Sequence, residues 1–213
     1  NGFVKNRVME FVGPGVSSLP VEFRNGIDVM TTETACWSSV WRTDERVEEY
    51  LAIHGRQDAY KRLDPAPAAY YDRAVIVALD EIKPMIALPF HPSCAYTIDE
   101  LTGNPYEILK KSEDEARAAL GDESLALGLT DKISKSGEIR ADQGIIAGCA
   151  GGIFDNVAAA AQILAGKSTG GFPLSVYPGS QPAMMELAAN GCLLDLMSAG
   201  AVVKTAFCGP CFG

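Results

Sequence analysis

Three cysteines in the last third of the chain are the residues whose types and spacing best fit a chemical role. Cys208 and Cys211 form a C-x-x-C motif around Gly209 and Pro210, and Cys149 precedes them in a glycine-rich stretch. Thiolates bind soft metals, and paired thiols also exchange electrons with a disulfide. In a compartment that keeps thiols reduced, the motif therefore predicts metal or redox chemistry.

The C-x-x-C motif alone leaves several interpretations open. Its letters match the redox motif of thioredoxin, although Phe207 and not a tryptophan precedes it. A structural zinc site needs four ligands, and His54 and His91 are not spaced to complete one. A third interpretation is a pair of inert, buried cysteines in a Gly-Pro turn. A fourth joins Cys149 to the motif.

Alternating strands and helices are expected to position these cysteines. The pattern predicts strands over 144–148, 174–177 and 201–207, and helices over 153–165, 182–190 and 193–197. Such alternation is typical of an α/β fold in which helices cover both faces of a mostly parallel sheet. Ligands of these sheets gather where strands end, and both the Cys149 and the Cys208–Cys211 positions follow a predicted strand.

The first two thirds of the chain give a second set of expected elements. We predict strands over 7–12 and 71–79, the latter buried, and helices over 26–40, 43–54, 57–63 and 104–120. Trp37 and Trp41 are four residues apart and should pack together on one helix face. The solvent-exposed face of the last helix should carry Lys110, Lys111, Glu113 and Arg117. A polar surface segment is expected to follow over 121–142. A domain boundary is expected near Lys83-Pro84.

Composition excludes some classes of function. The 213 residues carry a net charge of −9, which argues against nucleic acid, because phosphate binding needs a basic surface. No apolar run reaches the roughly 20 residues of a membrane span, and no signal peptide is visible at the start. These features predict a cytoplasmic protein with no membrane partner.

Several short motifs together resemble the aconitase family. In order, they are Gly13-Pro14-Gly15-Val16, Met30 with Glu33, Gly148-Cys149, Pro178-Gly179-Ser180, and Cys208-Gly209-Pro210-Cys211-Phe212-Gly213. The resemblance runs from about residue 7 to the end. It implies an aconitase-like α/β fold with two subdomains. Residues 1–84 would be a second-domain segment, and residues 85–213 a third-domain segment that carries the cluster cysteines and is truncated at its C-terminus.

The resemblance also implies a cofactor and site residues. Cys149, Cys208 and Cys211 would bind three irons of a [4Fe–4S] cluster, and the fourth iron would stay open as a Lewis acid. Exposure to air is expected to empty such a site. Glu33 matches an active-site glutamate of the family, although a locally paired helix carboxylate is the alternative. Ser180 matches a loop near the cluster, but it also fits a helix N-cap.

Two departures from the family pattern bear on the activity. Val29 stands where aconitases place asparagine, and Ala150-Gly151-Gly152 stands where they usually carry Thr-Asn-Ser. The implied function is a [4Fe–4S]-dependent hydro-lyase acting on a small hydroxy-carboxylic acid. The remaining aconitase domains of the same polypeptide would be its partners, and residues 1–213 alone would be inactive. The alternative is a non-catalytic homologue with a cluster-sensing or binding role.

The other cysteines and histidines are expected to be structural. We expect Cys36, Cys94 and Cys192 to be ordinary buried or half-buried residues, His91 to lie in a turn, and His54 to lie at a helix end.

Overall fold

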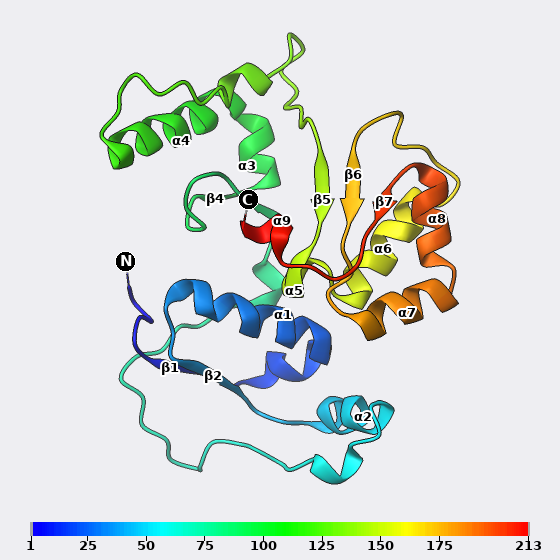
Figure 1. Cartoon of the computed structure of the whole chain (residues 1–213). Helices are drawn as coiled ribbons and strands as arrows, with labels where there is room; N and C mark the ends of the chain where they lie inside the picture. Colours follow the sequence, from blue (N-terminus) through cyan, green and yellow to red (C-terminus); the bar gives the residue numbers. More distant parts are fainter. Residues whose placement is uncertain (1, 213) are drawn as a thin grey trace. The chain divides into compact units, whose positions relative to one another are not determined.

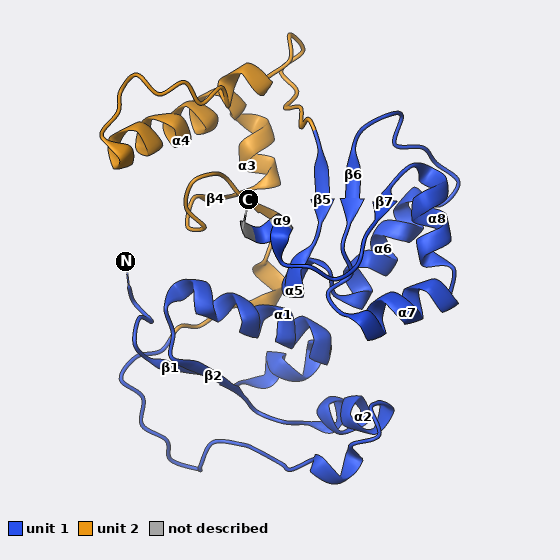
Figure 2. Cartoon of the chain, viewed as in Figure 1, with its two compact units in different colours: residues 1–74, 143–213 blue, residues 75–142 orange. Residues whose placement is uncertain are grey.

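The computed structural model describes residues 2–212 and divides into two compact units. Unit 1 comprises residues 1–74 and 143–213, and unit 2 comprises residues 75–142 (Figure 2). These units divide the chain at other positions than the expected boundary near Lys83-Pro84. The assignment of residues 1–84 and 85–213 to two family domains stays a prediction.

The N-terminal part of unit 1 is a parallel strand pair with a connecting helix. Strand β1 (Val8–Phe11) pairs with β2 (Ser38–Trp41), and α1 (Val21–Thr31) lies between them in sequence. Helix α2 (Glu45–Ile53) follows, with the Asp44 side chain accepting a hydrogen bond from the Val47 N–H as N-cap. Three short 3₁₀ turns complete this part: η1 (Pro14–Ser18), η2 (Thr32–Thr34) and η3 (Gln57–Ala59).

The prediction of one helix over 26–40 was wrong. The α-helix ends at Thr31, and Ala35 adopts a left-handed φ of 58° that turns the chain into β2. Trp41 stacks on Phe11 of β1 with 4.1 Å between ring centroids, whereas the side chain of Trp37 is 75% exposed. The two tryptophans therefore do not pack together, because pairing with β1 overrides local helix propensity.

The C-terminal part of unit 1 is a three-stranded parallel sheet with three longer helices and two short ones (Figure 1). Strand β6 lies between β5 and β7, and all pairings are parallel. The elements are β5 (Gly144–Ile146), α5 (Gly148–Gly151), α6 (Phe154–Leu164), β6 (Leu174–Val176), α7 (Gln181–Ala189), α8 (Cys192–Ala199), β7 (Val202–Val203) and α9 (Gly209–Phe212). The α/β class and the parallel pairing are confirmed.

Helices α6, α7 and α8 bury one face of this sheet. Their core residues Val157, Leu187 and Leu196 are fully buried together with Val176 of β6. Because side chains alternate along a strand, Ile145 and Val202 lie on the opposite face, where both remain about half exposed. The sheet therefore has one packed face and one open face within unit 1.

Unit 2 is a small hairpin with two helices. Strands β3 (Met85–Ala87) and β4 (Ala95–Thr97) are antiparallel, and helices α3 (Ile98–Gly103) and α4 (Pro105–Leu120) follow. Leu88, Leu101 and Leu109 form its core. The 3₁₀ turns η4 (Leu79–Glu81) and η5 (Thr130–Lys132) flank these elements. Among the described residues, no helix combines the length and apolar character needed to span a membrane.

Two further expectations were wrong. Residues 71–79 form no strand and are exposed, with Ile76 95% exposed, because no neighbouring strand pairs with them in the described chain. Glu113 is buried and not on the wet side of α4. Its carboxylate accepts hydrogen bonds from the Thr130 N–H at 3.0 Å and from Arg117 at 3.0 Å. These bonds hold the pKa of Glu113 below its usual value, although burial opposes them.

Candidate functional site

The three candidate thiols lie just beyond the carboxyl ends of the parallel strands. Cys149 is in α5, directly after β5, and the chain that leaves β7 leads to Cys208 and Cys211 at α9 (Figure 1). All three cysteines are exposed and free of disulfides. This placement agrees with the sequence-based expectation that ligands gather at this edge.

Backbone-to-backbone contacts join the loop after β5 to the loop after β6. The Gly179 N–H donates to Gly152 O at 2.6 Å, and the Gly152 N–H donates to Gly148 O at 2.8 Å. A Cβ atom at Gly152 would lie 2.4 Å from Tyr177 O and 2.9 Å from Gly179 N. No residue larger than glycine fits at 152 without separating the two loops, so the position of Cys149 depends on this contact.

Cys211 is the second thiol that the structure brings to the β5 loop. A Cβ atom added at Gly148 would lie 3.0 Å from Cys211 Sγ, and Gly148 has a left-handed φ of 84°. The side chain of Cys211 thus rests against the residue that precedes Cys149. Three soft thiol donors beside closely approaching glycines are chemically suited to a bulky iron–sulfur group.

The three thiols are not arranged as the ligands of one metal centre in the described residues. No group of three or more His, Cys, Asp or Glu side chains among residues 2–212 is placed to hold a metal ion. The donor set and its position fit a cluster, whereas its coordination geometry would require the three sulfurs to move together.

The other two predicted site residues lie on two different elements of unit 1. The Ser180 hydroxyl accepts a hydrogen bond from the Ala183 N–H at 3.3 Å, so it caps α7 as one of its two interpretations foresaw. Glu33 is exposed in η2, three residues beyond Met30. Because residues three apart share a helix side, Glu33 continues the side of α1 that Met30 occupies.

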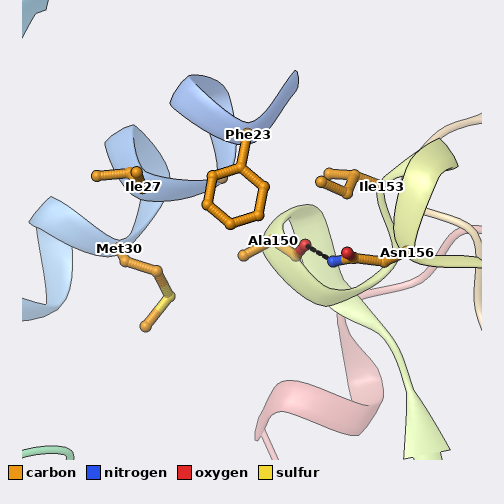
Figure 3. A pocket seen from close by; sticks show the side chains of 7 residues that line it. Phe23, Ile27, Met30, Ala150, Ile153 and Asn156 are labelled. Carbon is orange, nitrogen blue, oxygen red and sulfur yellow. Dashed lines mark hydrogen bonds between the residues drawn. The ribbon is translucent and has the colours of Figure 1, made fainter. Parts of the chain in front are cut away.

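A largely apolar pocket lies beside Cys149, between α1 and the start of α6 (Figure 3). Its volume is about 280 Å³. Its lining residues are Phe23, Gly26, Ile27, Met30, Ala150, Ile153 and Asn156. Asn156 is the polar member, and its amide already donates to Ala150 O at 3.2 Å. Ala150, the neighbour of Cys149, forms part of the wall, so the pocket adjoins the thiol loop.

The first turns of α1 are fixed by charged groups. Arg24 forms a bidentate ion pair with Asp44 at 2.7 and 3.1 Å, and both side chains are almost fully buried. Glu22 faces the start of α6, where burial and the charge of Asp155 raise the pKa of its carboxyl. One Glu22 oxygen is buried and has no hydrogen-bond partner in the described chain. The Arg24–Asp44 pair holds this part of α1, and with it the pocket wall, in place.

The pocket residues Phe23, Ile27 and Ile153 were missed by the sequence analysis. Phe23, Ile27 and Met30 recur at the spacing of one helix face, which a buried core face also shows. One sequence feature could have indicated the pocket. Val29 and Ala150 stand where aconitases carry polar residues, which makes this side of the site apolar.

Comparison with known proteins shows a family match over the whole chain and similar dehydratase subunits. The model of the aconitase family (aconitate hydratase) matches residues 1–213. The 3-isopropylmalate dehydratase large subunit of Moorella thermoacetica is 29% identical over 209 residues, covering 96% of this chain and 40% of that protein. That of Clostridium beijerinckii is 27% identical over 206 residues, covering 96% and 41%.

A relative with a different named substrate matches equally well. The 2,3-dimethylmalate dehydratase large subunit of Eubacterium barkeri is 27% identical over 208 residues, covering 97% of this chain and 41% of that protein. The chain thus spans about two fifths of the length of these relatives.

Proposed function

The chain belongs to the aconitase family, and from this premise we propose that the whole protein is a hydro-lyase acting on a small hydroxy-carboxylic acid. The observation that carries the proposal is the position of Cys149, Cys208 and Cys211, exposed and free at the carboxyl ends of parallel strands. The names of the relatives, which are dehydratases of substituted malates, support the same reaction class.

We propose that these three thiolates bind a [4Fe–4S] cluster. Such a cluster, when bound, supplies a Lewis-acidic iron for the hydroxyl that leaves. Gly148 and Gly152 keep the backbone close to the thiols without intruding side chains. Glu33, in η2 directly after α1, is proposed to exchange a proton with the departing or arriving water.

The substrate class is proposed from the apolar pocket. Isopropylmalate and dimethylmalate, which the relatives' names give, carry alkyl groups that citrate lacks. A pocket of about 280 Å³ walled by Phe23, Ile27 and Ile153 is suited to such a group. We therefore propose an alkyl-substituted malate as the substrate.

Two kinds of partner complete the proposal. The chain spans about 41% of the C. beijerinckii relative, which supports further domains in the same polypeptide, as the sequence analysis expects. The relatives are named large subunits, which supports a separate small subunit as well. Residues 1–213 alone are then expected to give no turnover of any alkyl-malate, even with a cluster.

Substituting Ile153 tests the substrate class. Asparagine is favourable at a helix N-cap, the position that Ile153 occupies before α6, so Ile153→Asn should leave the helix intact. In the whole protein with its partner, we expect this variant to lower the kcat/KM preference for an alkyl-malate over malate roughly tenfold, because apolar contact is lost.

Ile163→Asn is the matched control for this experiment. Ile163 lies on the same helix, is mostly exposed and is outside the pocket, so its variant should keep the wild-type preference. Equal preferences in wild type and Ile153→Asn would reject the pocket as the alkyl site. Absence of turnover with every malate would reject the hydro-lyase itself.

A non-catalytic homologue is the second candidate. The observation that favours it is the sequence Ala150-Gly151-Gly152, which offers no polar side chain beside Cys149. Such a protein would bind a cluster and turn over no malate, so cluster analysis and the substrate assay together separate the two candidates.

A further inference from the structure

Besides the thiols, two polar side chains meet directly after the parallel strands, where backbone hydrogen bonds continue the strand pairing by one residue. The Tyr177 N–H donates to Ile146 O, and the Lys204 N–H donates to Val176 O, so Ala147, Tyr177 and Lys204 form neighbouring positions across the three strands. By strand alternation from the buried Val176, Tyr177 and Lys204 lie on the open face. Ala147 directly precedes Gly148 and Cys149, so this row adjoins the thiol loops.

The ammonium of Lys204 is held in place by Tyr177. Lys204 Nζ donates to Tyr177 OH at 3.0 Å and lies 5.2 Å from the centroid of the same ring. In the described chain it forms no ion pair with a carboxylate. Among residues 2–212 its side chain donates to one partner, the hydroxyl of Tyr177, and an ammonium has three donors. Two donors remain available for an anion.

Lys204 is also the one basic residue on its side of the sheet segment. Residues 143–213 contain two lysines, Lys167 and Lys204, and no arginine. Lys167 follows α6 and precedes β6, so it lies at the opposite, amino end of the strands. Neighbouring strands are about 4.8 Å apart, so Lys204 is roughly 10 Å from the strand that leads to Cys149.

We propose that Lys204, oriented by Tyr177, binds a carboxylate of the substrate at this edge. The inference rests on the proposed hydro-lyase function and adds a substrate-binding residue to it. A substituted malate carries two carboxylates, and fixing one on an ammonium orients the molecule toward the thiol loops. Tyr177 acts through Lys204 and is a positioning residue.

The test compares Lys204→Met with Lys167→Met in the whole protein and its partner. Both variants remove one positive charge from the same segment, and both positions are exposed. We expect Lys204→Met to raise KM for an alkyl-malate at least tenfold with little change in kcat, and Lys167→Met to leave KM within twofold. Lys204→Arg should restore most of the affinity. The KM of Tyr177→Phe should lie between that of wild type and that of Lys204→Met.

A binding measurement keeps the test independent of turnover. Calorimetric titration of the cluster-free protein with malate at low salt should show binding that Lys204→Met loses and Lys167→Met retains. Equal KM and equal malate binding in the two lysine variants, or no malate binding by wild type together with an unchanged KM, would overturn the role of Lys204. A protein that binds malate through Lys204 and turns over no malate would instead refute the hydro-lyase while keeping the anion site.

Discussion

Arg24→Met is expected to destabilise the fold by about 3–5 kcal/mol, because it leaves the carboxylate of Asp44 buried without its counter-charge. Arg24 is 2% and Asp44 8% exposed, and the pair is bidentate. Asp44 also caps α2, so the pair joins α1 to the start of α2. Urea unfolding of the whole protein, followed by tryptophan fluorescence, should report the loss, since Trp41 lies in β2 next to α1.

The loss should depend on pH. Burial alone would raise the pKa of Asp44, but the hydrogen bonds and charge of Arg24 outweigh burial and hold it below the usual value. A carboxyl with a depressed folded pKa contributes stability above its unfolded pKa of about 4, and this contribution is lost as pH falls through the folded value. The difference between wild type and Arg24→Met should therefore be largest near neutral pH and shrink in acid.

Two further variants test whether the loss of stability in Arg24→Met comes from the unpaired buried charge. Arg62→Met breaks the exposed pair with Asp64 and should change stability little. Adding Asp44→Asn to Arg24→Met should cost less than the sum of the single variants, because no unpaired charge then remains buried. Strict additivity would contradict a coupled ion pair.

Gly152→Ala is expected to have the largest effect on the site itself. The new Cβ would lie within 3 Å of Tyr177 O, Gly148 O and Gly179 N, all of them backbone atoms that no rotamer change can move. Relief requires the β5 and β6 loops to separate, at a cost of about 1–3 kcal/mol or more. The displaced Cys149 should then bind iron weakly, which iron analysis after gel filtration would measure.

Gly151→Ala is the matched control, because a Cβ there meets no atom within 4 Å and the residue lies in a helical turn. Alanine should be neutral or slightly stabilising at this position. If Gly152→Ala and Gly151→Ala retained the same iron and the same stability, the close approach of the two loops would have no part in placing Cys149.

The sequence predicts the local features of this molecule better than its non-local ones. The strand–helix alternation after residue 143 and the helix within 43–54 both depend on residues close in sequence, and both are present. The segment 38–41 forms a strand, whereas the more apolar segment 71–79 does not. Only the first finds a partner strand, β1, and this partner is set by tertiary structure.

The candidate site divides in the same way. The thiols could be found because C-x-x-C is specific and because Cys149 and Cys208 follow predicted strands. The pocket could not, since Phe23 and Ile27 form an ordinary apolar helix face until Ala150 and Ile153 are known to lie opposite. The pairing of Lys204 with Tyr177 depends on the register of β6 and β7, which no local pattern encodes.

Counting iron and sulfide after anaerobic reconstitution of the whole protein tests the central claim most directly, with Cys149→Ser beside Cys36→Ser. The Cys36 thiol contacts Thr34 Oγ1 and Val4 O, and a serine hydroxyl can make the same two contacts. The Cys36→Ser control should therefore stay folded and bind iron like wild type. The account predicts about four irons per wild-type chain, an electron paramagnetic resonance signal on reduction, and loss of both in Cys149→Ser. Equal iron in Cys149→Ser and wild type, or none in wild type, would contradict a three-thiolate cluster at this edge of the sheet.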